Sequence, residues 1–383
     1  MTDQVTYSCR GLTTGQALSI HVKGGVIVSI DHGDAAPRAA PLIIPALVDL
    51  QVNGFMGHDL NEGHLAVETV IALSQALSRV GVCAYLPTLI TAGEDEICQR
   101  LTAIRQAVEE CPTSGKMIAG IHIEGPAISN LDGPRGAHPA EHVRPASVAE
   151  FARWQEACGG LVKIVTLAPE TGGACNFIKH ATSTGVVVSL GHSNADEEDV
   201  ARAVDAGATM STHLGNGISN LLLRHPNAIW AQLADDRLTA SFIADRHHLP
   251  KSTLTAMIRA KGVERSVLIS DSVRFAGQPA GHYHSAIGGD VEVSQDGRVS
   301  IAGTPFLAGS GSSLLDILLG FPEFTGMPLE DAVTMACSAP ARHIGLKNEL
   351  AEGQPANFIL LEQDGKASKP TVSDIIFDGE SVM

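Results

Sequence analysis

The sequence GVVVSLGHSNADEEDVARAVDAGATMSTH, residues 185–213, contains the pattern that decides the fold. An apolar run at 185–190 is followed by a polar break, a helical pattern at 196–206 and a second apolar run at 208–212. Nearly continuous apolar runs of this length are typical of strands in parallel sheets that are buried on both faces. The stretch therefore predicts a strand, a helix and a second strand parallel to the first.

The same alternation extends on both sides of this stretch. Eight apolar runs lie at 42–52, 81–89, 117–123, 161–167, 185–190, 208–212, 238–243 and 266–269, with helical patterns at 65–80, 94–110, 196–206 and 252–261. Eight strands alternating with helices predict an α/β fold, a (β/α)8 TIM barrel. A doubly wound open sheet is the alternative, but no G-x-G-x-x-G motif follows the first run.

Both ends of the chain have a different pattern. Residues 18–31 alternate around Lys23-Gly24-Gly25, which is a hairpin signal, and 357–362 and 373–379 again indicate strands around turns. We expect these ends to meet in one small β-sandwich. The predicted domains are residues 1–43 and 349–383 for the two parts of the sandwich, and residues 44–348 for a metal-dependent hydrolase barrel.

The composition excludes several classes of protein. With 44% hydrophobic and 18% charged residues the chain is a folded protein, and a net charge of −16 disfavours binding to nucleic acid or anionic lipid. The seven cysteines include no C-x-x-C pair, which fits a reducing compartment. No apolar run approaches the roughly 20 residues of a membrane helix, and no signal peptide is apparent. We therefore expect a cytoplasmic protein with no membrane or nucleic-acid partner.

Polar side chains follow the predicted strands. The residues at the ends of apolar runs are Gln51, Asn53, His122, Glu124, His192, His213, Asp245, His247, His248 and Asp271, and strand ends share one rim in a parallel barrel. One Glu and two His have the composition of a catalytic zinc or iron site with an open position. Asp271 could then carry the proton between water and leaving group. The structural alternatives are a helix cap for Glu124 and a salt bridge for Asp271.

Several motifs together carry a family resemblance. They are Ile44-Pro-Ala-Leu-Val-Asp-Leu-Gln-Val-Asn-Gly54, His122-Ile-Glu-Gly-Pro126, Arg135-Gly-Ala-His-Pro139, Gly191-His-Ser-Asn-Ala195, Thr212-His-Leu-Gly-Asn216, Ile243-Ala-Asp245 with His248, Ser270-Asp-Ser272 and Leu307-Ala-Gly-Ser310. In order and spacing the chain resembles the amidohydrolase superfamily. Within it, the chain is similar to the deacetylases that act on N-acetylglucosamine 6-phosphate, and the resemblance covers nearly the whole chain.

The resemblance implies a barrel with a β-sandwich and a homodimer. It assigns the metal ligands to Glu124, His192 and His213, and the general base and acid to Asp271. Many relatives have His-x-His at the end of the first strand, where this chain has Gln51-Val52-Asn53. Because amides are weak ligands beside imidazole, we predict one divalent metal ion per subunit, zinc with iron as the alternative.

The resemblance also assigns the substrate contacts. His138 lies beside the scissile acetamide and could polarise its carbonyl. Arg224 grips the phosphate, for which a guanidinium is suited, although a surface salt bridge is the alternative. The complete expected set is Ala137, His138, Asn216, Gly217, Arg224, His248 and the loop of Leu307, Ala308 and Gly309.

Some positions depart from the pattern of the family. Arg246 and His247 stand in the motif after the seventh strand, and Arg274 follows Asp271. These changes surround the expected sugar pocket and leave the metal site unchanged, so they bear on which substrate is bound more than on which reaction is catalysed. We predict removal of acetyl from N-acetylglucosamine 6-phosphate to give glucosamine 6-phosphate. The alternatives are the same reaction on an epimeric or unphosphorylated N-acyl amino sugar, and a sugar-phosphate binding protein without catalysis.

Overall fold

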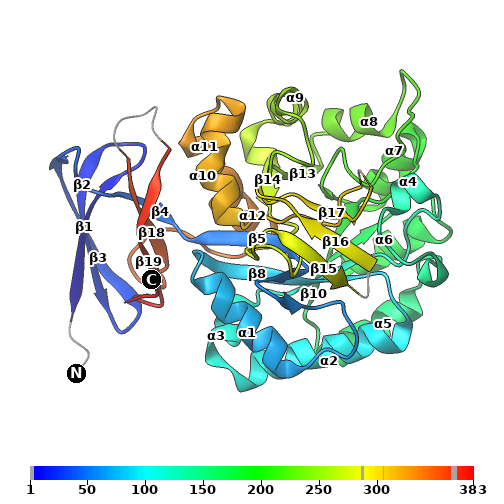
Figure 1. The fold of residues 1–383 in the computed structure, drawn as a ribbon, viewed down its shortest axis with the longest axis horizontal. Helices are drawn as coiled ribbons and strands as arrows, with labels where there is room; N and C mark the ends of the chain where they lie inside the picture. Colours follow the sequence, from blue (N-terminus) through cyan, green and yellow to red (C-terminus); the bar gives the residue numbers. More distant parts are fainter. Residues whose placement is uncertain (1–3, 286–288, 305, 364–368) are drawn as a thin grey trace.

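The computed structural model describes residues 4–285, 289–304, 306–363 and 369–383. It contains a parallel barrel surrounded by helices and, beside it, a separate sheet that both ends of the chain build (Figure 1). In the described ranges, no helix combines the length and the apolar character needed to cross a membrane.

The barrel is one eight-stranded parallel sheet, as the sequence predicts. Its strands are β5 (Leu47–Val52), β8 (Val82–Ile90), β9 (Ile121–Glu124), β10 (Val162–Leu167), β11 (Val187–Leu190), β12 (Met210–Ser211), β13 (Thr239–Ile243) and β14 (Ser266–Ile269). The sheet closes beyond the ends of β5 and β14, where Val52 pairs with Ser272 in parallel. There the Asp271 amide donates to the Gln51 carbonyl at 3.0 Å. The TIM barrel prediction is therefore confirmed.

Helices cover the outside of the barrel (Figure 1). They are α1 (Val67–Ser78), α2 (Glu94–Glu110), α3 (Pro112–Met117), α5 (Val148–Ala157), α6 (Ala174–Ser183), α7 (Glu197–Ala206), α8 (Ala228–Ala234), α9 (Lys251–Lys261), α10 (Leu314–Thr325), α11 (Leu329–Val333) and α12 (Ala339–His343). The helix predicted at 94–110 has the same bounds as α2. Helix α7 begins one residue after Asp196, whose carboxylate accepts from the Asp199 amide at 2.8 Å and caps the helix.

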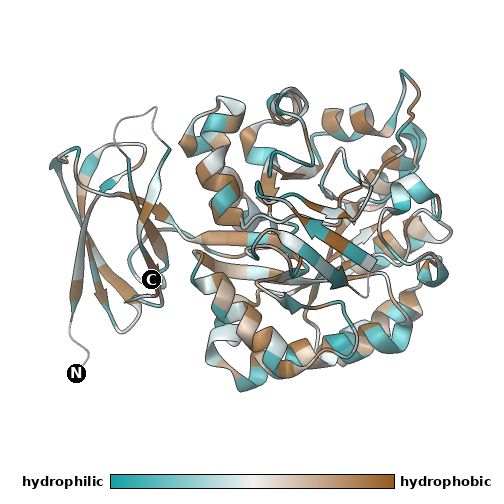
Figure 2. Cartoon of the chain, viewed as in Figure 1, coloured by the Kyte–Doolittle hydropathy of each residue, from teal (hydrophilic) through white to brown (hydrophobic). Residues whose placement is uncertain are grey.

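The first predicted strand, 42–52, is divided between two sheets. Its first part is β4 (Leu42–Pro45), which joins the terminal sheet, and its second part is β5 of the barrel. Strand β5 is mostly hydrophobic in Figure 2. Because both sheets bury apolar side chains, the hydrophobic pattern alone does not mark where the chain passes from one to the other.

The terminal sheet has seven strands. In spatial order they are β20 (Glu380–Ser381), β19 (Thr371–Phe377), β18 (Phe358–Glu362), β4, β1 (Val5–Gly11), β2 (Gln16–Lys23) and β3 (Val26–Ala35). The predicted hairpin is present, since Lys23 pairs with Val26 across Gly24 and Gly25. Both glycines have positive φ, 58° and 79°, as a two-residue turn of this kind requires. The sheet surrounds its own small core, which includes Ile20 and Phe358.

A small antiparallel sheet lies between β14 and α10. It consists of β15 (Gly281–Ser285), β16 (Gly289–Val293) and β17 (Val299–Ile301), and the sequence patterns do not predict it. Its inner residues Val291, Val293 and Val299 pack with Phe275. A two-stranded ribbon, β6 (Gly54–Phe55) and β7 (His58–Asp59), follows the first barrel strand. Both small elements stand at the end of the barrel where the strands terminate.

Lys261 provides a test of the barrel's outer packing. Its side chain is fully buried, and its ammonium donates to the carbonyls of Gln232 and Asp235 at the end of α8, at 2.8 and 2.6 Å. The Lys261→Met substitution removes the donor to the Gln232 carbonyl and one of the two donors to the Asp235 carbonyl, which also accepts from the Leu238 amide at 3.1 Å. We therefore expect the free energy of unfolding to fall by roughly 1–3 kcal/mol. Chemical denaturation measures this change. Lys251→Met, at the exposed start of the same helix, is the control. Equal stability of the two variants would contradict the role of Lys261.

Candidate active site

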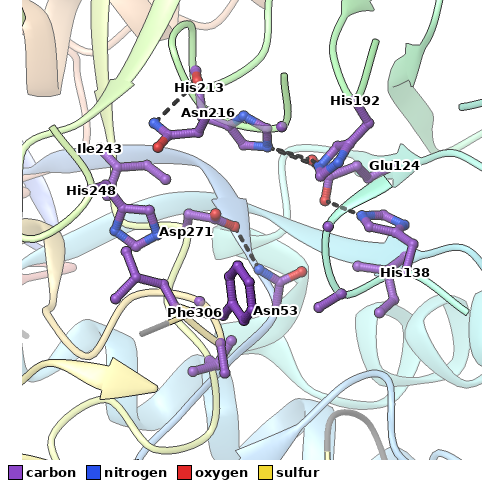
Figure 3. A pocket seen from close by; sticks show the side chains of 18 of the residues that line it. Asn53, Glu124, His138, His192, His213, Asn216, Ile243, His248, Asp271 and Phe306 are labelled. Atoms are coloured by element: carbon purple, nitrogen blue, oxygen red, sulfur yellow. Dashed lines mark hydrogen bonds and ion pairs between the residues drawn. The ribbon is translucent and has the colours of Figure 1, made fainter. Parts of the chain in front are cut away.

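A cavity of about 450 Å³ opens at the carboxyl ends of the barrel strands. Side chains from the ends of β9, β11, β12 and β14 line it together with residues of the small sheet β15–β17 (Figure 3). This volume falls in the range of small-molecule sites, and this rim is where TIM barrels place their chemistry. The cavity is therefore the candidate active site.

Three buried side chains converge on one side of the cavity. The Glu124 Oε1 atom lies 3.0 Å from His213 Nε2 and 3.2 Å from His192 Nε2, and the two Nε2 atoms are 3.1 Å apart. All three residues are at most 8% exposed. Figure 3 shows that they point toward one another from separate elements.

The metal-site residues and Asp271 occupy similar positions at the carboxyl ends of their strands. Glu124 is the last residue of β9, whereas His192, His213 and Asp271 each stand two residues beyond the end of a strand. These three residues have positive φ, 50°, 29° and 47°. The left-handed backbone is uncommon for residues other than glycine and is often found at functional sites. Here it turns the side chains inward over the rim.

The imidazole of His192 is oriented by a hydrogen bond to the backbone. Its Nδ1 atom lies 2.9 Å from the Pro134 carbonyl oxygen, which can only accept. Nδ1 therefore carries a proton, so Nε2 is the ring nitrogen that faces Glu124 and His213 and is placed to ligate a metal ion. This is the arrangement of a metal-ligating histidine.

The Glu124 carboxylate is held in its charged form. Burial alone would raise its pKa, but His192 and His213 together keep the pKa of Glu124 well below its usual value. The Gln51 amide also donates to Glu124 Oε1 at 2.9 Å. A buried carboxylate that remains ionised between two imidazole nitrogens is a strong ligand for a cation.

The three side chains fit a divalent metal ion. One ligand atom from each of Glu124, His192 and His213 lies within 4.8 Å of the others, and all three residues are buried. Two nitrogen donors and one oxygen donor match the ligand sets of catalytic zinc and iron sites. This group of residues could therefore bind the metal on which the sequence prediction depends.

Asp271 is the second carboxylate of the cavity. The Asn53 amide donates to Asp271 Oδ1 at 2.7 Å, and Figure 3 shows this pair across the cavity from His192 and Glu124. Burial and the nearby Glu124 carboxylate raise the pKa of Asp271 to about 6. A carboxyl group with a pKa near the working pH can both accept and return a proton.

His138 is neutral and presents a hydrogen-bond donor to the cavity. Its Nδ1 atom lies 2.8 Å from Thr91 Oγ1 and accepts from the Thr91 amide at 3.4 Å, so Nδ1 carries no proton. Burial, followed by the charge of His192, lowers the pKa of His138 to about 3. The proton of the neutral ring is therefore on Nε2, 3.7 Å from Glu124 Oε2.

His248 is held by Asp245. Its Nδ1 atom lies 2.7 Å from Asp245 Oδ2, and Asp245 Oδ1 accepts from the amides of His247 and His248, each at 2.9 Å. Burial disfavours the histidine cation, but the carboxylate of Asp245 outweighs burial and raises the pKa of His248 above its usual value. The Asp245 carboxylate therefore favours the cationic form of His248 at the cavity wall.

The cavity brings together most of the residues expected to contact substrate. Its lining includes Ala137, His138, Asn216, Gly217, His248, Leu307, Ala308 and Gly309. Arg224 is not among the lining residues of this single chain, and its contact with a phosphate stays a prediction.

The three basic residues that depart from the family pattern, Arg246, His247 and Arg274, bond to groups outside the cavity. Arg246 pairs with Glu323 at 2.7 Å, and His247 Nε2 lies 3.2 Å from the Asp296 carbonyl. Arg274 forms an ion pair with Glu62. In the described part of the chain, none of the three lines the cavity.

Sequence reasoning misses several lining residues. Asp59 and Asn61 enter from the ribbon that follows β5, and Phe306 precedes the expected loop of Leu307–Gly309. The only signal for the first two was their position shortly after a strand end. Nothing in the sequence pattern distinguishes Phe306 from a core residue.

Comparisons with known proteins agree with this geometry. The sequence profile of the amidohydrolase family matches residues 42–382. N-acetylglucosamine-6-phosphate deacetylase of Bacillus subtilis (strain 168) is 32% identical over 331 residues, 85% of this chain and 82% of the relative. N-acetylgalactosamine-6-phosphate deacetylase of Escherichia coli O157:H7 is 34% identical over 339 residues, 88% of this chain and 87% of the relative.

A solved structure has the same fold along its whole length. It is an aspartate-to-alanine variant of N-acetyl-D-glucosamine-6-phosphate deacetylase from Mycobacterium smegmatis in complex with N-acetyl-D-glucosamine-6-phosphate. It is 28% identical, covers 99% of both chains and has a TM-score of 0.86. Since the family profile spans most of the chain and curated relatives exceed 30% identity, the chain belongs to the amidohydrolase family.

Proposed function

We propose that this chain hydrolyses N-acetylglucosamine 6-phosphate to glucosamine 6-phosphate and acetate. One observation carries the proposal, namely that a buried Glu-His-His group and an aspartate with a raised pKa face each other across one cavity. A binding protein has no need for such a proton-transfer group. The names of the relatives support the substrate class.

We assign the metal ion to Glu124, His192 and His213, one ion per chain, and propose zinc with iron as the alternative. The ion would polarise the scissile carbonyl and activate the attacking water. A second ion has weak support, because the amides of Gln51 and Asn53 are poor ligands and each already donates to a carboxylate.

Asp271 moves the proton in this proposal. Its carboxylate takes a proton from the attacking water and returns it to the nitrogen as the C–N bond breaks, so that acetate and the free amine leave. The hydrogen bond from Asn53 occupies Oδ1 and leaves Oδ2 for this task. His138 Nε2–H donates to the carbonyl oxygen as negative charge develops there.

The sugar phosphate occupies the remaining cavity. We assign it to Asn216, Gly217 and His248, with Arg224 as the expected phosphate ligand. N-acetylgalactosamine 6-phosphate is a second candidate, because a deacetylase named for that epimer is 34% identical to this chain. The homodimer and the cytoplasmic location that the resemblance implies stay predictions.

A substrate panel tests the function. We expect the metal-loaded protein to release acetate from N-acetylglucosamine 6-phosphate with the highest kcat/KM, and removal of the phosphate to lower kcat/KM about 10- to 100-fold, the worth of one or two charge-assisted hydrogen bonds. Acetate and free amine are quantified for both epimers with and without phosphate. A higher kcat/KM for the galacto epimer would favour the second candidate. If no sugar releases acetate, the remaining alternative is a sugar-phosphate binding protein without catalysis.

Asp271→Asn tests the proton transfer. The substitution keeps the shape of the side chain but removes the base, so kcat should fall by about 10²- to 10⁴-fold while the metal content is retained. Glu124→Gln should lose both metal and turnover, and Asp95→Asn, exposed at the start of α2, should change neither. Elemental analysis and acetate release measure the two quantities. Near-normal turnover by Asp271→Asn would show that another group transfers the proton.

The pH dependence follows from the same carboxylate. Asp271 must be ionised to accept a proton, and burial with Glu124 raises its pKa to about 6, whereas a bound cation stabilises the ionised form. Therefore kcat/KM should decline on acidification, with a midpoint between the ordinary aspartate pKa of about 4 and 6. A pH–rate profile measures the midpoint. A midpoint above pH 7 would exclude Asp271 as its origin.

A further inference from the structure

The cavity has two chemically different walls. One wall carries the Glu-His-His group with His138, and the other is apolar. The apolar wall consists of Val273, Phe275, Val291, Ile301, Phe306 and Leu307. The proposed reaction uses the first wall, and of the second wall only Leu307 belongs to the residues expected to contact substrate.

Phe306 differs from the rest of the apolar wall. Phe275 and Val291 are at most 5% exposed and belong to the small core beneath β15–β17, whereas Phe306 is 62% exposed. A large apolar ring left open to solvent at a cavity is informative, because the chain itself does not bury it. The Phe275 ring, by contrast, packs against Tyr283, with centroids 5.4 Å apart.

The backbone fixes the position of Phe306. Its carbonyl accepts from the Ile301 amide at 3.0 Å, and its own amide donates to Thr304 Oγ1 at 3.3 Å. The next residue, Leu307, pairs with Ser300 beside β17. These hydrogen bonds hold the backbone of Phe306 in place. Because this backbone is already ordered, a ligand that contacts the ring pays little conformational entropy on binding.

Phe306 faces the space beside the reacting atoms. Figure 3 shows its ring directed into the space that Asp271, His248 and Asn53 surround. In the proposed reaction the acetamide lies between Asp271 and the Glu-His-His group. The sugar ring, which carries the acetamide on its second carbon, must then occupy the adjoining space on the side of Phe306.

We propose that Phe306 is a binding residue on which the pyranose ring of the substrate stacks, with one C–H face of the sugar against the face of the phenyl ring. This inference rests on the proposed function and adds a residue to it. A pyranose face carries several C–H groups, which are apolar and slightly positive, and the face of an aromatic ring is apolar and slightly negative. The contact orients the sugar and takes no part in bond breaking.

Kinetics of Phe306 variants test the proposal. Phe306→Ala should raise KM for N-acetylglucosamine 6-phosphate about five- to twentyfold with kcat changed less than threefold, because uniform binding is lost. Phe306→Tyr keeps the aromatic face and should stay within twofold of the wild type. Trp230→Ala removes another exposed aromatic ring that does not line the cavity and should leave KM unchanged.

A second substrate separates the sugar from the acyl group. With N-formylglucosamine 6-phosphate, which lacks the acyl methyl group, stacking on the sugar predicts the same KM ratio between Phe306→Ala and wild type. A ratio near one would mean that Phe306 contacts the methyl group, and it would overturn the proposal. An unchanged KM in Phe306→Ala with an active wild type would overturn this inference alone, whereas an inactive wild type would overturn the proposed function and this inference with it.

Discussion

Closure of the parallel sheet between β5 and β14 is the constraint on which the site depends. In a flat sheet with strands about 4.8 Å apart, β9 and β12 would be separated by roughly 14 Å. In the barrel, the Glu124 and His213 ligand atoms that follow these strands are 3.0 Å apart. Closure also brings β14 back beside β5, so that Asn53 reaches Asp271. Without closure, the two carboxylates could not face each other.

The electrostatics of the site follow from this convergence. Burial opposes the ionised form of both carboxylates, but Glu124 has the Nε2 atoms of His192 and His213 within 3.2 Å, and these imidazoles outweigh burial. The charges of His213 and His248 offset burial of Asp271 only in part. Asp271 instead experiences the charge of Glu124, which adds to burial and raises its pKa to about 6. Two identical functional groups in one cavity thereby acquire different properties, a constant ligand and a group that can exchange protons.

Much of the fold and of the metal centre could be predicted from the sequence. Period and length of the apolar runs identify the barrel strands, and the polar residues that follow them indicate a metal site of one Glu and two His. The family resemblance assigns that site to Glu124, His192 and His213. Local chemistry also sufficed for the Gly24-Gly25 hairpin and for the Asp196 cap of α7. These features depend on neighbours in the chain, or on the general rule that parallel strands end at one rim.

Two kinds of feature became visible only in the folded structure. They are the sheet that a segment joins and the direction in which a loop side chain points. The run 42–52 has one hydrophobic pattern but serves two sheets, and strands β15, β16 and β17 form a small sheet beside the cavity that no pattern predicts. Arg246 turns away to Glu323 and Phe306 turns toward the cavity, although both stand in loops beside it. Periodicity and strand ends encode the eight barrel runs, helices such as 94–110 and the composition of a metal site, because these features depend on local repeats along the chain. The direction of a loop side chain depends on contacts with residues far away in the chain, so only the folded structure decides it.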